Sequence, residues 1–243
     1  GDINVSESYL GLAEYLQKLD GAQGNCSNKI FYLAVPPHLY EPVFLNVEKA
    51  NLVKPCTRSG SDVWTRVLVE KPFGSDPASA IRLDKLLGKL FEENQIFRID
   101  HYLAKEALQN IISFRFANPI FEPIWNRGLI ERVEIKLFEK NDVSTRGAFY
   151  DSIGAIRDVG QNHILQMLAL VAMEDPGGIT AEKIRNARER VLRDVAPFSG
   201  RPEEYISVAQ YNGYKNEIGV KENSQTETYF QLKLAVKNRR WRN

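Results

Sequence analysis

Residues 30–37 have the sequence IFYLAVPP, six apolar residues in a row that end at two prolines. An uninterrupted apolar run of this length predicts a buried strand of a parallel sheet. Proline has no backbone N–H to donate, so Pro36 and Pro37 end the strand. Two similar runs follow at 63–69 and 95–99. Together the three runs predict a small parallel sheet.

Between these runs, apolar residues recur at helical spacing. The predicted helices cover residues 6–19, 40–51 and 77–93. Strands that alternate with helices are typical of a doubly wound α/β sheet, which binds its ligands at the carboxyl ends of the strands. In this sequence those ends carry Val35-Pro36-Pro37, Glu70-Lys71-Pro72 and Arg98-Ile99-Asp100-His101.

The pattern changes after residue 100. Helices are predicted over 101–114, 154–173 and 180–195. Alternation of apolar and polar residues over 132–140 and 226–236 predicts strands with one exposed face, and hence a largely antiparallel sheet packed on one side by helices. We therefore expect an α/β plus α+β chain whose domains meet near residues 98–100.

The composition is that of an ordinary globular chain, since 43% of the 243 residues are apolar and 26% are charged. A formal net charge of +1 gives no basic field for nucleic acid. No apolar run approaches the roughly 20 residues that span a bilayer, and no signal-peptide pattern opens the chain. Two cysteines, Cys26 and Cys56, are too few for a disulfide framework or a cysteine metal site, and they favour a reducing, cytoplasmic compartment.

Asp100 can cap a helix that begins at His101, and Lys105 would follow one turn later on the same face. A helix N-terminus with two cationic side chains suits a phosphate, because the dipole and charge-assisted bonds both favour an anion. The alternative is a solvated helix start with a surface lysine. Spacing alone leaves both open.

His163 lies five residues after Asp158 in an apolar segment. A histidine that acts as a general base needs a carboxylate that fixes its tautomer and stabilises the imidazolium. The alternative is a core histidine whose hydrogen bonds are satisfied internally. A metal site built from His101, His163 and an aspartate is a third alternative, but no compact two-histidine motif is present, and we predict no metal.

Four blocks stand out by their order and spacing. They are EKPFG at 70–74, RIDHYLAKE at 98–106, FANPIF at 116–121 with PIWNR at 123–127, and IRDV at 156–159 with QNH at 161–163. These blocks resemble those of the glucose-6-phosphate dehydrogenase family, and the resemblance is strongest over 29–174. It implies the C-terminal part of an NADP-binding Rossmann-like domain at 1–98 and an incomplete substrate-binding α+β domain at 99–243.

The resemblance implies an oxidoreductase of the oxidative pentose phosphate pathway. Such an enzyme oxidises the C1 hydroxyl of glucose 6-phosphate by hydride transfer to NADP and forms 6-phosphoglucono-lactone. His163 would take the hydroxyl proton, and Asp100 would orient His163. His101, Tyr102 and Lys105 would hold the sugar 6-phosphate.

The resemblance also assigns residues to the sugar hydroxyls and the cofactor. Glu139 and Asp158 would bind sugar hydroxyls, and Lys71 would reach both sugar and cofactor. Tyr40, with Pro36-Pro37 before it, would lie along the cofactor. Proteins of this family commonly pair through the second domain, so we expect a homodimer or homotetramer.

The sequence departs from the family pattern at Ala104, where glycine is usual; alanine is the better helix former by about 1 kcal/mol. The family's glycine-containing nucleotide fingerprint, and the arginine that would contact the 2′-phosphate, are not among these residues. We therefore expect half a cofactor domain and weak NADP binding by the segment alone. The Lys71-Pro72 bond is a candidate for cis/trans variation. Two alternatives stay open, a non-catalytic sugar-phosphate-binding fragment and a broader hexose-6-phosphate dehydrogenase.

Overall fold

The computed structural model describes residues 1–242 except 23, 25, 57–62 and 75. The chain divides into two compact units, unit 1 at Gly1–Ile99 and unit 2 at Asp100–Asn243. This division lies within the stretch where the sequence pattern changes. Among the described residues, no helix is both long and apolar enough to cross a membrane.

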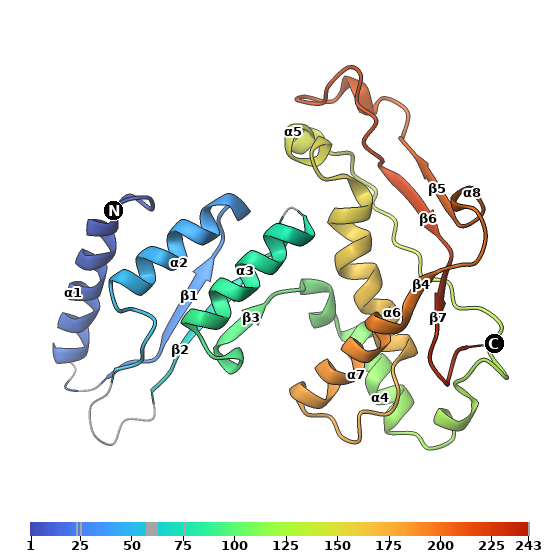
Figure 1. The fold of residues 1–243 in the computed structure, drawn as a ribbon, viewed down its shortest axis with the longest axis horizontal. Helices are drawn as coiled ribbons and strands as arrows, with labels where there is room; N and C mark the ends of the chain where they lie inside the picture. The colour runs from blue at the N-terminus through green and yellow to red at the C-terminus, as the bar shows by residue number, and fades with distance from the viewer. Residues whose placement is uncertain (23, 25, 57–62, 75, 243) are drawn as a thin grey trace. The chain divides into compact units, whose positions relative to one another are not determined.

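Unit 1 is built on three parallel strands in the order β1-β2-β3. The strands are β1 Lys29–Leu33, β2 Thr65–Val69 and β3 Ile96–Arg98. The helices are α1 Ser6–Ala22, α2 Tyr40–Lys49 and α3 Pro77–Leu90, with short 3-10 turns η1 Pro37–Leu39 and η2 Glu93–Gln95. Figure 1 shows α2 and α3 side by side along the sheet, and the two helices pack on each other. The predicted parallel α/β arrangement is confirmed.

The core of unit 1 lies between the sheet and its helices. Val67 and Val69 of the central strand are 0% and 1% exposed, because Phe44 of α2 and Leu87 of α3 belong to the same apolar cluster. The prediction that the first strand is buried throughout is wrong. Alternate residues of β1 are exposed, because among the described residues only one face of β1 packs against this cluster.

Local sequence fixes the turn between β2 and α3. Gly74 has a φ of +83°, and a Cβ at this position would lie 2.6 Å from the backbone nitrogen of Ala80, so only glycine fits. Asp76 caps α3 by accepting from the Ser79 N–H at 2.8 Å, and Pro77 occupies the first helical turn. The Lys71-Pro72 peptide bond before this turn is cis.

The two cysteines of unit 1 form a disulfide, Cys26–Cys56. The pair joins the segment before β1 to the segment that follows α2. The inference of a reducing compartment from these cysteines is therefore not supported, because disulfides are rare in reducing compartments.

Unit 2 packs helices beside two short antiparallel ladders, β4-β7 and β5-β6. Its helices are α4 Glu106–Phe116, α5 Gly147–Asp151, the π-helix η6 Ile156–Ile164, α6 Leu165–Ala172, α7 Ala181–Asp194 and α8 Pro202–Tyr205. Its strands are β4 Val195–Pro197, β5 Ile206–Ala209, β6 Tyr229–Leu232 and β7 Leu234–Val236. The 3-10 turns are η3 His101–Ala104, η4 Glu122–Ile124, η5 Ser144–Arg146 and η7 Tyr214–Asn216. The core lies between α6 and α7, with α4 against it.

Two predicted strands of unit 2 need correction. Residues 132–140 do not form a strand, although Ile135 and Leu137 are the half-buried positions that the alternation predicts. Alternation predicts an extended chain, but a strand also needs a paired neighbour, and among the described residues none pairs here. The predicted strand 226–236 is two strands, because the chain changes partner at Lys233.

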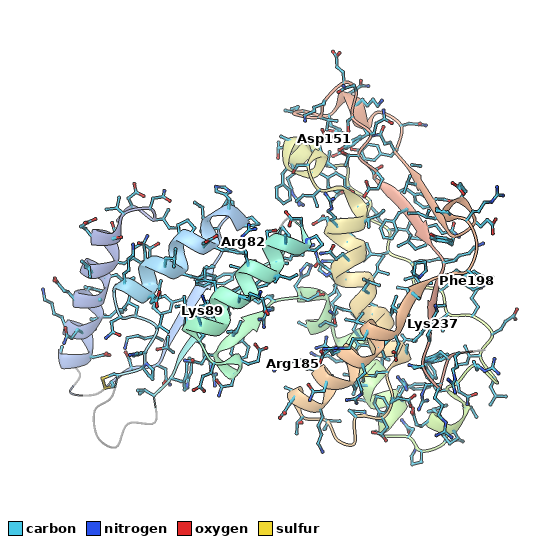
Figure 2. The ribbon with its side chains drawn as sticks, in the orientation of Figure 1. Arg82, Lys89, Asp151, Arg185, Phe198 and Lys237 are labelled. Carbon is cyan, nitrogen blue, oxygen red and sulfur yellow. A yellow bond between two sulfur atoms is a disulfide. The ribbon has the colours of Figure 1, made fainter. Side chains whose placement is uncertain are left out.

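The polar stretch 212–225 is tied to the rest of unit 2 by a carboxylate. Asp151, at the end of α5, accepts hydrogen bonds from Tyr214 at 3.0 Å and from Ser224 (Figure 2). Tyr214 is 1% exposed. Asp151 therefore holds the stretch 212–225 against the end of α5.

Candidate functional site

Asp100 and His163 meet in unit 2, although 63 residues separate them in the sequence. Asp100 Oδ1 lies 2.6 Å from His163 Nδ1, and the imidazole is 1% exposed. A carboxylate is an acceptor, so the neutral ring donates from Nδ1 and presents Nε2 as its basic nitrogen. The pair therefore has the geometry that a general base needs.

The first turn after β3 places Asp100. Its Oδ1 also accepts from the backbone N–H of Tyr102 at 3.0 Å, which confirms the predicted capping role. The α-helix predicted over 101–114 begins later than predicted, however. A 3-10 turn, η3, comes first, and Lys105 has extended backbone angles before α4 begins at Glu106. His101 and Lys105 therefore do not share one α-helical face.

The segment that carries His163 is also different from prediction. Residues Ile156–Ile164 form a π-helix before α6 begins, within the span 154–173 predicted as one helix. In a π-helix the hydrogen bonds join residues five apart, as between the Leu165 N–H and the Gly160 carbonyl. This winding brings Asp158 and His163, five residues apart, onto neighbouring turns. Single π-helical turns are frequent at functional sites.

Tyr102 stacks on the imidazole. Its ring centroid lies 4.1 Å from that of His163 with 26° between the planes, while Lys105 Nζ lies 3.7 Å from the centroid of the same tyrosine. The imidazole and the lysine amine are both too close to the Tyr102 ring to lie over the same face of it. The tyrosine ring therefore lies between Lys105 and His163. His101 packs edge-on against His163 at 4.8 Å. The structure therefore brings together all three residues predicted to hold a phosphate.

The carboxylates predicted to bind sugar hydroxyls lie at the same place. Tyr102 donates from its hydroxyl to Glu139 at 3.5 Å. Burial raises the pKa of Tyr102, and the charges of Glu139 and Asp158 raise it further. Burial also raises the pKa of Tyr150 to about 12, with Asp158 as the largest charge contribution. Acceptors and hydroxyl groups thus lie beside the dyad.

The dyad could offer ligands to a metal ion. Asp100, His101 and His163 each present one donor atom, and these atoms lie within 4.8 Å of one another. Asp100 Oδ1, however, is already bound by His163 and by a backbone N–H. That this group of residues holds no metal stays a prediction.

The residues predicted to bind the cofactor belong to unit 1. Pro37 begins the turn η1 after β1, and Tyr40 begins α2. The Tyr40 hydroxyl donates to the Glu70 carbonyl at 3.0 Å, which ties the end of β1 to the residue before Lys71. Tyr40, Pro36, Pro37 and Lys71 therefore follow the carboxyl ends of β1 and β2, where a parallel sheet binds a dinucleotide.

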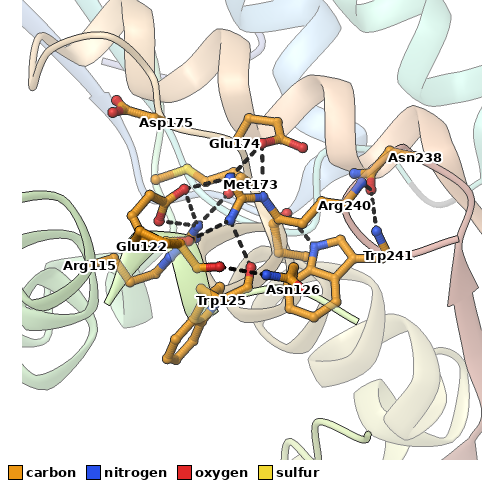
Figure 3. A network of polar contacts seen from close by, with 12 residues as sticks. Arg115, Glu122, Trp125, Asn126, Met173, Glu174, Asp175, Asn238, Arg240 and Trp241 are labelled. Atoms are coloured by element: carbon orange, nitrogen blue, oxygen red, sulfur yellow. Dashed lines mark hydrogen bonds and ion pairs between the residues drawn. The ribbon is translucent and has the colours of Figure 1, made fainter. Parts of the chain in front are cut away.

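A buried arginine holds the C-terminal end of the helix that continues from His163. Arg115 of α4 is 0% exposed and donates to three carbonyl groups at the end of α6, those of Leu170, Val171 and Met173 (Figure 3). Glu122 pairs with Arg115 at 3.1 Å and also with Arg240. The network satisfies carbonyls that a helix end leaves without partners.

An apolar groove of ≈ 540 Å³ also lies in unit 2, lined by Phe114, Trp125, Ile130 and Val133 among others. None of the candidate site residues lines it. The groove is thus separate from the dyad.

Sequence reasoning did not identify Arg188, a residue of α7 whose charge interacts with that of Asp100. Helix α7 is rich in charged residues, and this composition favours a solvent-exposed position for an arginine. The available signal was its spacing, because Arg188 falls in the stripe of Ile184, Ala187 and Val191 that faces the core.

Two family models together match nearly the whole chain. A family model described as "Glucose-6-phosphate dehydrogenase, C-terminal domain" matches residues 112–243, and one described as "Glucose-6-phosphate dehydrogenase, NAD binding domain" matches residues 1–110. The chain is 44% identical over 217 residues to glucose-6-phosphate 1-dehydrogenase 6, cytoplasmic, of Arabidopsis thaliana, covering 88% of this chain and 40% of the relative. It is 40% identical over 250 residues to glucose-6-phosphate 1-dehydrogenase 3, chloroplastic, of the same plant, covering 99% and 40%.

A solved structure of glucose-6-phosphate dehydrogenase in complex with its substrate glucose-6-phosphate matches with a TM-score of 0.86 and 33% identity. The match covers 100% of this chain and 50% of that chain. The chain thus spans half the length of these proteins or less. Because one family model alone matches more than half of the residues and the second matches nearly all the rest, the chain belongs to the glucose-6-phosphate dehydrogenase family.

Proposed function

We propose that the full-length protein oxidises glucose 6-phosphate at C1 with NADP as hydride acceptor and forms 6-phosphoglucono-lactone. The observation that carries the proposal is the 2.6 Å contact between Asp100 and a buried His163, beside the cluster of His101, Tyr102 and Lys105. Family membership and the named substrate of the matching solved structure support it.

Each residue of unit 2 has a role that follows from its chemistry. His163 Nε2 takes the proton of the C1 hydroxyl, and Asp100 stabilises the imidazolium that forms. His101, Tyr102 and Lys105 bind the 6-phosphate, so that binding energy remote from C1 positions the reacting carbon. Glu139 and Asp158 accept hydrogen bonds from sugar hydroxyls.

Unit 1 carries the residues for the dinucleotide. Tyr40, Pro36 and Pro37 lie at the end of β1, and Lys71 lies at the end of β2. When bound, the nicotinamide accepts the hydride that leaves C1. The substrate thereby loses a hydride and a proton, and the C1–O bond becomes the lactone carbonyl.

We also propose a partner, a second copy of this chain, and a cellular compartment. An exposed apolar side chain on the β5–β6 ladder, Val208 at 56%, supports pairing of copies through unit 2, as a homodimer or homotetramer. Sedimentation of the full-length protein tests this. A cytoplasmic location is supported by the name of one plant relative, while another is named chloroplastic.

The deciding experiment is a cofactor-reduction assay on the full-length protein with NAD and NADP and several hexose 6-phosphates. We expect NADP reduction with glucose 6-phosphate. His163→Asn should lower kcat by about 10²–10⁴-fold, because the base is lost, while the KM for the sugar phosphate changes little. Retained turnover in this variant would remove His163 as the base.

The controls separate the alternatives. His38→Asn replaces a histidine outside the dyad and should leave kcat unchanged. Glucose 6-phosphate binding without any turnover by the wild type would favour a sugar-phosphate-binding module. Comparable turnover of several hexose 6-phosphates would favour a broader dehydrogenase.

A further inference from the structure

Arg188 lies on the side of α7 that faces the core. Its neighbours in the stripe, Ala187 and Val191, are 1% and 2% exposed. Burial lowers the pKa of the Arg188 guanidinium, and the negative charge of Asp100 opposes this shift. A partly buried cation in an apolar stripe is costly unless a compensating charge is near. The compensating charge here is the carboxylate of the dyad.

The hydrogen bond of Arg188 also connects it to the segment that carries His163. Its Nη1 donates to Gln166 Oε1 at 2.9 Å, and Gln166 lies three residues after His163. Arg188 Nε is buried and has no hydrogen-bond partner among the described residues, and the same is true of Asp100 Oδ2. One is a donor and the other is a free carboxylate oxygen.

We infer that Arg188 is a positioning residue for the Asp100–His163 dyad. Its positive charge favours the ionised carboxylate of Asp100, and its bond to Gln166 fixes the turn that follows His163. The catalytic meaning of this role rests on the proposed function. The charge coupling itself does not, because it acts in the protein without substrate.

Several charged groups face this arrangement and set its pH behaviour. Two charged groups act on Arg188. They are Asp100, at the start of unit 2, and Arg185, on the same helix as Arg188. His163 faces Asp100, His101 and Tyr102. The charged groups around Tyr102 are Lys105, Glu139, Asp100 and Asp158.

The test is the titration of the His163 imidazole by NMR in the full-length protein, with its signals assigned by their loss in His163→Asn. Arg188→Gln keeps a donor toward Gln166 but removes the charge. We expect the His163 midpoint to rise by about one pH unit, because loss of a nearby cation favours the imidazolium. Arg188→Lys keeps the charge and should stay within roughly 0.3 units of the wild type.

Arg190→Gln is the matched control, since Arg190 lies on the same helix and is exposed. Its His163 midpoint should not move. In the reduction assay, the acid limb of kcat/KM should shift upward in Arg188→Gln and stay in place in the other two variants. A merely structural arginine would lower activity without this charge-dependent shift.

An unchanged midpoint in folded Arg188→Gln, or an equal shift in Arg188→Lys, overturns the inference. If Arg188→Gln does not fold, Arg188→Lys decides. A raised His163 midpoint in Arg188→Lys, or failure of that variant to fold, would show that the positive charge is not what matters and would overturn the inference. A shifted midpoint in a protein that never oxidises glucose 6-phosphate keeps the coupling and rejects the proposed function. The two failures are thus distinguishable.

Discussion

Tyr102 is the side chain that joins the base to the phosphate-binding residues. One ring face stacks on His163, and Lys105 lies over the other. The ring therefore fixes the imidazole plane by packing, while the hydroxyl donates to Glu139. Substitutions can separate these two contributions.

We predict that Tyr102→Phe raises the KM for the sugar phosphate but keeps kcat, because the ring stays and only the hydroxyl is lost. Tyr102→Leu should also lower kcat by about tenfold, since an aromatic pair contributes about 0.5–1.5 kcal/mol. Steady-state kinetics on the full-length protein measure both constants. Equal kcat values in the two variants would show that stacking does not position His163.

Resemblance, and not periodicity, identified the residues of the dyad. Nothing in a sequence separation of 63 indicates that Asp100 and His163 touch, because tertiary packing alone decides it. The capping role of Asp100, in contrast, followed from local chemistry and is confirmed. Arg188 was missed because a charged residue is ordinarily expected at the surface, although its spacing places it in the apolar stripe.

At the scale of elements, regular spacing predicted which segments are helical but not how they wind. The helix over 101–114 divides at Lys105, and that over 154–173 begins as a π-helix. Both departures occur beside the dyad, where contacts with other segments override local propensity. The segment 132–140 shows the same limit for strands, since pairing requires a partner that no alternation pattern specifies.

Helix α6 ends in the Arg115 network, and this end determines how firmly the segment with His163 is held. We predict that Arg115→Met lowers the free energy of unfolding of unit 2 by about 3–5 kcal/mol, because three carbonyls at the end of α6 lose their buried donor while Glu122 keeps Arg240. Urea unfolding measures this. Arg190→Met, an exposed change on α7, is the control and should stay within about 0.5 kcal/mol. A small effect in both variants would contradict the assigned role.

At the scale of the whole molecule, the two units are separate bodies with separate cores. The Cys26–Cys56 bond closes a loop of 30 residues in unit 1 alone. We predict that dithiothreitol lowers the free energy of unfolding of unit 1 by about 3–4 kcal/mol, because the unfolded chain gains freedom. Hydrogen exchange read by mass spectrometry should show faster exchange in unit 1 peptides only.

The doubly substituted protein, Cys26→Ser with Cys56→Ser, controls for effects of the reductant. Its exchange should be fast in unit 1 with or without dithiothreitol. Identical exchange in the oxidised wild type and this variant would show that the cross-link adds no stability.

The wide helix before α6 has a consequence for how this chain tolerates change. A wide turn holds about one residue more than an α-helical turn does, because its hydrogen bonds join residues five apart. Removing one residue between Ile156 and Gln161 would therefore let the coil relax to α-helical pitch with little rotation of α6. This stretch can thus absorb the loss of one residue by a change of winding, and the packing of α6 would survive it.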